Sequence, residues 1–327
     1  MLVRFFRSHQ PILLVFIPLF AGCIWIPSFL HPVVTVVGGL QNQMPLFLLF
    51  AKPLCAYPFL SVLLAFLILL LQAFQFNALL GKFELIGGQS YFPALLYVCF
   101  CSFLPSVRTL HPALLSAVFV LLALNCVLGT HRISNASPAC FEAGLSMALA
   151  SLIFFPMVLG LVFVLIAVAI LRPFSARDLI VVFLGFLLPW IYVFVFYFYF
   201  DHLADFWTTA IALPVLHRSS TFSFQMALPY LELLFFTLVA VFFSFVVGTD
   251  KSSRSVQYRS TITVLRWMFV FGVLVLFVSP GYNYTYFFMG LIPVLVLISD
   301  YFLTAKVVWM AELVMWLLVG VLIFNNQ

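Results

Sequence analysis

The chain has 327 residues, of which 66% are hydrophobic, 18% are aromatic and only 7% are charged. No water-soluble domain can bury that much apolar surface in one core, so the composition excludes a soluble enzyme and favours a polytopic membrane protein. The formal net charge is +5, with 14 Lys and Arg, and in such a chain basic residues mostly report membrane topology rather than nucleic-acid binding. We therefore expect an all-α transmembrane bundle in which residues 1–327 form a single membrane domain, without a soluble domain.

The N-terminal segment places Arg4 and Arg7 before an apolar run from Ile12 to Leu30, as in a signal peptide or a first transmembrane helix, and we interpret it as a retained first helix. Residues 31–52 contain proline, glycine and a polar Gln-Asn-Gln, a pattern that predicts an interfacial or re-entrant segment. Eight further spans are predicted in chain order, at residues 57–76, 91–104, 110–128, 179–200, 230–248, 261–278, 286–298 and 304–324.

The central stretch from Phe141 to Leu171 fits no single simple span. It holds 31 residues with one charge, Glu142, and a proline, Pro156, near its middle. As one straight helix it would be about 46 Å long, against a hydrocarbon core of about 30 Å. Two full spans would have only about fifteen residues each, whereas a span needs about 20.

The distribution of basic residues decides between the two arrangements of this stretch. If the stretch crosses the membrane once, five of the 14 basic residues share the side of the N-terminus and nine lie opposite. If it returns to the side where it began, eleven share the N-terminal side, and three remain opposite, namely Lys52, Arg108 and Arg218. The eleven are Arg4, Arg7, Lys82, Arg132, Arg172, Arg177, Lys251, Arg254, Arg259, Arg266 and Lys306.

Because positive charge concentrates on the cytoplasmic side, the second arrangement is favoured. We expect about nine full spans plus a short or re-entrant helical hairpin near Phe141–Leu171, with the N-terminus cytoplasmic and the C-terminus external. The alternative is one long, tilted, proline-kinked helix.

Local signals agree with the ends of the hairpin. Ser137 suits an N-cap followed by Pro138 at the first helical position, and Glu142 would then lie in the opening turn, where the helix dipole favours an anion. After the second arm, Ser175 and Asp178 have the spacing of a capping box that opens the next span.

Under this topology the external face collects most of the reactive side chains. The catalytic candidates are Arg108, His111, His217 and Arg218. The substrate-binding candidates are Lys52, Asp201, His202, Tyr282 and Tyr284. Basic groups and tyrosines at a membrane surface can hold the pyrophosphate and sugars of a lipid-linked saccharide, with arginine supplying bidentate phosphate contacts. The alternative is that each residue is an interfacial anchor or a solvated loop residue.

Metal and nucleotide chemistry lack a sequence signal. Asp201, His202 and Asp205 resemble a ligand set, but no HExxH motif and no Cys/His cluster accompanies them, so we interpret them as a polar helix end. The chain also has no GxSxG motif and no phosphate-binding glycine loop. We expect neither a metal nor a cofactor.

Two carboxylates fall within predicted spans. Glu232 follows a proline in the first turn of its helix, where the helix dipole accounts for it, whereas Glu312 lies deep in the last span. Glu312 is therefore a candidate for proton-coupled transport or for a buried structural hydrogen bond. Polar amides also occur in predicted spans, at Gln72, Gln75, Asn77 and Asn125.

Four apolar runs carry a family resemblance: FNALLGKFELIGGQSYFPALLYVCFCSFLP, LHPALLSAVFVLLAL, FEAGLSMALASLIFFP and LRPFSARDLIVVFLGFLLPW. They resemble a family of uncharacterised bacterial polytopic inner-membrane proteins, some of which bear an automatic beta-carotene monooxygenase name. The resemblance implies a bacterial inner membrane and transfers no active site. The carotene-cleaving enzymes need four histidine iron ligands on a soluble propeller, a scaffold that this chain cannot form.

A looser similarity of architecture links the chain to envelope-polysaccharide polymerases and ligases, which act on lipid-linked sugars at the external face. Three hypotheses follow: an enzyme or assembly factor for lipid-linked envelope saccharides, a proton-coupled small-solute transporter, or a non-enzymatic subunit of an envelope complex. The expected partners are membrane lipids and either a lipid-linked saccharide or other envelope proteins, and not nucleic acid.

Overall fold

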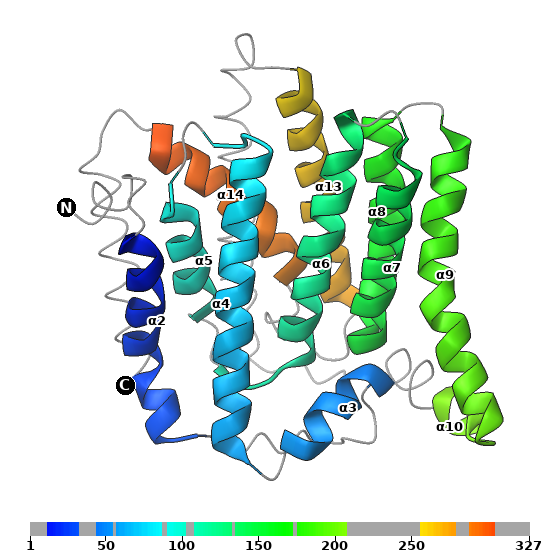
Figure 1. Cartoon of the computed structure of the whole chain (residues 1–327), viewed down its shortest axis with the longest axis horizontal. Coiled ribbons are helices and arrows are strands. Elements are labelled where there is room, and N and C mark those ends of the chain that lie inside the picture. The colour runs from blue at the N-terminus through cyan, green and yellow to red at the C-terminus, as the bar shows by residue number, and fades with distance from the viewer. Residues whose placement is uncertain are drawn as a thin grey trace.

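The computed structural model is a bundle of helices, and no strand occurs in the ranges it describes (Figure 1). Those ranges are residues 12–32, 44–54, 57–86, 90–102, 108–132, 135–172, 175–207, 256–278 and 288–304. The four helices in this part of the chain that are long and apolar enough to cross a membrane are α4 (Pro58–Lys82), α6 (Pro112–Gly129), α9 (Ala176–Tyr199) and α13 (Val256–Val278). Their length and apolar composition indicate a membrane protein.

The remaining helices are shorter. They are α2 (Ile12–Leu30), α3 (Pro45–Leu54), α5 (Phe92–Ser102), α7 (Ser137–Ile153), α8 (Leu159–Leu171), α10 (Leu203–Phe206) and α14 (Phe288–Thr304). Every side chain of α5 is buried, and so is every residue from 289 to 300 of α14. With 11 residues, α5 is only about 17 Å long and cannot cross a hydrocarbon core of about 30 Å.

The predicted all-α bundle is confirmed, but the count of nine full spans is not. The span predicted at residues 91–104 is a short interior helix, because its neighbours cover it on all sides. The span predicted at residues 230–248, and nearly all of the span at 304–324, lie outside the described residues.

The stretch from Phe141 to Leu171 forms a helical hairpin. Helix α7 runs from one end of the bundle and α8 runs back toward that end (Figure 1). Between them, Phe154 adopts an extended backbone conformation, with φ −137° and ψ 103°, and the short 3-10 helix η4 (Phe155–Val158) carries the chain around. The turn contains the proline that the sequence analysis singled out.

The two ends of the hairpin lie together. Ser137 at the start of α7 and Arg172 just after α8 both contact Asp178, at 3.3 Å and 3.1 Å. A single helix over residues 141–171 would hold its ends about 46 Å apart. The predicted hairpin is therefore confirmed, and the alternative of one kinked helix is wrong.

Helices α7 and α9 run parallel and cross closely at two glycines. A Cβ atom at Gly144 would lie 2.1 Å from the Val182 carbonyl oxygen, and one at Gly185 would lie 2.3 Å from the Phe141 carbonyl oxygen. Only glycine allows the two backbones to approach this far, which is the usual way in which membrane helices gain packing contacts. The Trp190 indole then donates to the Ser151 hydroxyl at 3.0 Å, further along the same crossing.

Helices α13 and α14 run antiparallel to each other. Helix α13 packs against α8 of the hairpin, whereas α14 packs against α13, α5 and α6. Gly272 and Gly290 bring their backbones together, because a Cβ at Gly272 would lie 2.3 Å from the Gly290 nitrogen. Phe163 of α8 packs on Phe271 of α13, with ring centroids 6.1 Å apart. The N-terminus of α13 therefore lies at the same end of the bundle as the C-terminus of α8 (Figure 1).

Two details at helix starts differ from the sequence expectation. Ala136, not Ser137, is the N-cap of α7, so Glu142 lies beyond the first turn, where its carboxylate accepts a contact from the Cys126 thiol at 3.7 Å. Ser175 is the N-cap of α9 as predicted, but its hydroxyl donates to the Arg172 carbonyl oxygen at 3.4 Å instead of capping the helix. Both serines bond to neighbouring elements that sequence spacing alone does not reveal.

Candidate functional site

Basic side chains collect at one end of the bundle, which we call the basic end and define by Lys82, Arg172, Arg177 and Arg259. These residues lie at the C-terminus of α4, after α8, and in the first turns of α9 and α13, which meet at one end (Figure 1). All four belong to the group that the charge count placed with the N-terminus. Which compartment the basic end faces remains a prediction.

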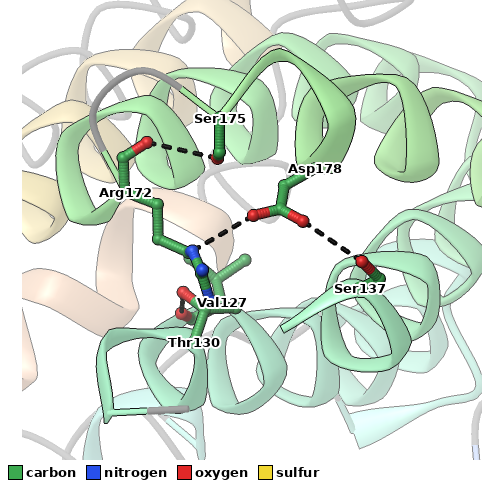
Figure 2. Close-up of polar contacts among 6 residues, drawn as sticks. All are labelled: Val127, Thr130, Ser137, Arg172, Ser175 and Asp178. Atoms are coloured by element: carbon green, nitrogen blue, oxygen red, sulfur yellow. Dashed lines mark hydrogen bonds and ion pairs between the residues drawn. The ribbon is translucent and has the colours of Figure 1, made fainter. Parts of the chain in front are cut away.

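Side-chain pairs tie the helices together at the basic end. Lys82 of α4 donates to the Asn125 amide oxygen of α6 at 2.9 Å. Figure 2 shows a second group, the Asp178 cluster, made of Ser137, Arg172, Ser175 and Asp178. There the Arg172 Nε lies 3.1 Å from Asp178 Oδ2, and the Ser137 hydroxyl donates to Asp178 Oδ1 at 3.3 Å.

The Asp178 carboxylate is 7% exposed and the Arg172 side chain 22% exposed. Removing a carboxylate from water is costly unless an opposite charge and hydrogen bonds compensate it. Asp178 receives both, from two different helical segments, so it holds α7, α8 and α9 in one arrangement. From the sequence, Asp178 is expected to belong to a capping box, and Arg172 is only one of the basic residues that indicate topology. Nothing in the spacing of the two residues indicates that they form an ion pair.

The opposite end, which we call the α3 end, carries α3 and the predicted residues Arg108 and His111. The Nε and Nη2 atoms of Arg108 both donate to the Ser102 carbonyl oxygen, at 3.4 Å and 3.1 Å. Ser102 is the last residue of α5, where the helix dipole favours a cation. The Ser102 hydroxyl in turn accepts from the buried Trp25 indole at 2.9 Å. Arg108 therefore caps the C-terminus of α5, and the same residue, Ser102, links α5 to α2.

His111 is the N-cap of α6. Its Nδ1 accepts from the Ala113 N–H at 3.2 Å, which requires that Nδ1 carry no proton. Burial lowers the pKa of His111 to about 4, so the imidazole is neutral at pH 7. One residue earlier, the Leu110 N–H donates to the Ser61 hydroxyl of α4 at 3.2 Å. The structure thus places Arg108 and His111 in one short segment, each with a backbone-capping contact.

Helix α3 lies across this end of the bundle rather than along it (Figure 1). Phe47 is 1% exposed and belongs to a cluster with Leu110 and Ile153. Met44, just before the helix, packs with Leu152 and Phe206. The interfacial segment predicted at residues 31–52 thus contains a helix that covers the tip of the hairpin. Residues 33–43 and the side chain of Lys52 are outside the described part.

Of the remaining predicted site residues, the structure describes Asp201 and His202. Asp201 and His202 are exposed in the turn between α9 and α10, where Asp201 has a positive φ of 56°. In the described ranges, no group of three His, Cys, Asp or Glu side chains is placed to hold a metal ion. His217, Arg218, Glu232, Tyr282, Tyr284 and Glu312 lie outside those ranges.

The intramembrane amides have distinct environments. The Gln72 amide nitrogen donates to the Leu114 carbonyl oxygen, and its amide oxygen accepts from the Tyr97 hydroxyl at 3.0 Å, so one side chain joins α4, α5 and α6. By contrast, the side-chain oxygens of Gln75 and Asn77 are buried without a hydrogen-bond partner. Unsatisfied buried acceptors cost free energy, which makes these two positions of α4 unusual.

Sequence reasoning missed one buried carboxylate. Asp300 is 2% exposed and accepts from the Tyr258 hydroxyl at 3.1 Å. The predicted span ended at residue 298, which placed Asp300 in a loop. The signal that could have found it is the apolar sequence Tyr-Phe-Leu after Asp300, since α14 continues to Thr304.

The helical fold and the four long apolar helices indicate that this is an all-helical membrane protein. The chain belongs to DUF6427, a family of unknown function whose sequence profile matches residues 35–326. Comparison with curated proteins finds no match, and neither does comparison with solved structures. The family match agrees with the resemblance to an uncharacterised family and brings no activity with it.

Proposed function

We propose that this protein is a multi-pass protein of the bacterial inner membrane that assembles or processes lipid-linked saccharides of the cell envelope at its α3 end. In this proposal the basic end and the N-terminus face the cytoplasm and the C-terminus is external, because positively charged residues concentrate on the cytoplasmic side. The observation that carries the proposal is the position of Arg108, held at the α3 end beside the N-cap His111 and next to a helix that lies across the bundle.

Arg108 is the one cationic side chain at the α3 end among the Lys and Arg whose side chains are described. A guanidinium whose direction is fixed by the Ser102 carbonyl loses less freedom when it binds an anion. Arginine is also the side chain best suited to bidentate phosphate contacts. These properties suit a pyrophosphate group at the membrane surface.

His111 contributes differently in this proposal. Since burial lowers its pKa to about 4, it adds no positive charge at neutral pH. Its Nδ1 is the N-cap acceptor, so the remaining ring nitrogen, Nε2, carries the proton of the neutral imidazole. We assign phosphate attraction to Arg108 and a neutral donor role to His111.

The test compares a full deletion with Arg108→Ala and Arg108→Lys. We expect the deletion and Arg108→Ala to lose surface polysaccharide, while Arg108→Lys, which keeps the charge and loses the fork of donors, retains part of it. Arg177→Ala at the basic end is the matched control and should leave the polysaccharide unchanged. Because Arg108 also caps α5, membrane abundance and thermal stability in detergent must be measured alongside. Unchanged surface polysaccharide in the deletion strain would rule the proposal out.

A second candidate, proton-coupled transport of a small solute, is favoured by Asp300 and Tyr258. An ionisable group buried among membrane helices is a candidate for an ion or proton pathway. Proteoliposomes containing the intact protein should then show solute uptake that depends on a pH gradient and that Asp300→Asn abolishes. Absence of flux across a broad solute panel would reject this candidate.

A further inference from the structure

The hairpin reaches only part of the way across the bundle. Helix α7 has 17 residues and α8 has 13, so the arms are about 26 Å and 20 Å long. Helix α9 starts from the same end and has 24 residues, which makes it about 36 Å long. The tip of the hairpin therefore ends about 10 Å before the surface that α9 reaches.

The tip is buried at this depth. Ile153, Phe154 and Met157 are all less than a tenth exposed. The side chains that cover the tip come from outside the hairpin: Phe47 of α3 packs on Ile153, and Phe206 of α10 packs near Leu152. The apolar face of α3 thus fills the space between the tip and the end of the bundle.

The outward side of α3 exposes a large apolar side chain, Leu49, in a helix whose one charged residue is Lys52. Leu49 is 71% exposed, a fraction that would be costly for a large aliphatic side chain in water and is ordinary at a lipid boundary. Phe59 and Leu60, in the first turn of α4, are exposed as well. Three exposed amphipathic aromatic residues occur at the same end, namely Tyr57, Tyr199 and Trp207.

Tyrosine and tryptophan concentrate at the level of lipid headgroups, because their rings are apolar and their polar atoms bind water. Tyr57 and Tyr199 adjoin the ends of α4 and α9, the two longest apolar helices in the described ranges. Two helices therefore independently mark the same boundary, and α3 lies across the bundle at that end (Figure 1).

We propose that α3 is an interfacial helix that binds the phospholipid surface through its Leu49 face and seals the tip of the α7–α8 hairpin from water. The partner is the boundary between headgroups and acyl chains. The hairpin is then in contact with water only at the basic end. Two complete spans would place the turn between them in water, whereas the turn of this hairpin stays within the membrane. This proposal does not depend on the proposed function.

Spin labels on the full chain in phosphatidylethanolamine/phosphatidylglycerol liposomes test the proposal. A label at Leu49→Cys should be accessible to oxygen and clearly less accessible to the water-soluble Ni(II) complex than a label at Glu84→Cys, which is exposed in the turn after α4. Leu184→Cys, on the exposed middle of α9, is the control for a fully lipid-facing site. Equal nickel access at Leu49 and Glu84 would overturn the proposal.

A second measurement tests the seal itself. Ile153→Cys should not react with a water-soluble maleimide beyond the labelling of the unsubstituted chain, and it should become reactive when Phe47→Ala is added. Reactivity of Ile153→Cys with Phe47 in place would mean that water reaches the tip and would contradict the proposal. Lack of reactivity in both variants would mean that Phe47 does not form the seal, which also contradicts it.

Discussion

The helices are joined by pairs of polar side chains at the basic end, and by backbone caps and buried apolar side chains at the α3 end. At the basic end, Lys82 binds Asn125 and Asp178 binds both Arg172 and Ser137. At the α3 end, Arg108 caps α5, His111 caps α6, and α3 packs over the hairpin tip. The first set depends on pairs of charged and polar side chains and therefore on salt. The second depends mainly on apolar packing, on the Arg108 cap of α5 and on the protonation state of one imidazole.

The largest effect is expected between the two ends, where α7 crosses α9. Gly144→Leu should abolish a folded, monodisperse protein, because the new Cβ would lie 2.1 Å from a backbone oxygen that cannot move alone. Overpacking usually costs about 1–3 kcal/mol, and more when backbone must shift. Gel filtration and thermal unfolding in detergent measure the loss.

Two other glycines provide controls for this substitution. At Gly160 the nearest atom, 2.4 Å from a new Cβ, is the flexible end of the Met147 side chain, so Gly160→Ala should cost much less. At Gly81 nothing lies within 4 Å, and Gly81→Ala should be neutral or stabilising by up to about 1 kcal/mol. Equal loss at Gly144 and Gly81 would contradict the close crossing.

Phe47→Ala tests how strongly apolar packing holds the α3 end. Phe47 is 1% exposed, and truncating a buried phenylalanine costs about 3–5 kcal/mol. Leu49→Ala on the same helix is the matched control, because that side chain is exposed and belongs to no buried cluster, so in detergent it should lower the free energy of unfolding much less than Phe47→Ala does. If both variants unfold at the same temperature, α3 does not pack as described.

Asp178→Ala tests the polar pairing at the basic end. We expect a loss of about 1–3 kcal/mol, less than for a fully buried pair because water partly screens Arg172. Ser137→Ala, which removes one hydrogen bond and leaves the ion pair, should cost about 1 kcal/mol. The Asp178→Ala effect should shrink in high salt, whereas the Phe47→Ala effect should not. If the loss of stability in Asp178→Ala did not depend on salt, the basic end would not differ from the α3 end in its dependence on charge.

The smallest effect is a pH dependence confined to the α3 end. The pKa of His111 is lowered to about 4 from an ordinary value near 6.5, so the unfolded chain takes up the proton first as pH falls. The contribution of His111 to stability is therefore complete above about pH 6.5 and is lost progressively toward pH 4.

Asparagine is a good N-cap that does not titrate in this range, so His111→Asn isolates the effect. Unfolding temperatures between pH 7.5 and 4.5 should fall less for His111→Asn than for the parent protein. Parallel curves for the two proteins would exclude His111 as the titrating group.

Charge distribution and composition predicted the class of protein, the hairpin near Pro156 and the grouping of Lys82 with Arg172. These features follow from one-dimensional patterns, since the membrane sets helix lengths and charge sets sidedness. The ion pair of Arg172 with Asp178 and the short interior helix α5 could not be predicted. They depend on which helices become neighbours, and a nearly uniform apolar sequence gives no periodicity that reports it.

The candidate site was predicted less well than the fold. Arg108 and His111 do lie in one segment at one end, but their capping contacts follow from the ends of α5 and α6, which the sequence located only to within two residues. The glycine crossing of α7 and α9 was also missed, because the sequence does not indicate that the helices of Gly144 and Gly185 pack directly against each other.

The sidedness of the two ends of the hairpin tests the account most directly. Single cysteines at Asn135 and Ala176, both exposed at the basic end, should react with a membrane-impermeant maleimide from the same side of the membrane. A cysteine at Tyr57 should react from the other side only. Opposite sidedness of the Asn135 and Ala176 positions would contradict the hairpin and the assignment of the two ends.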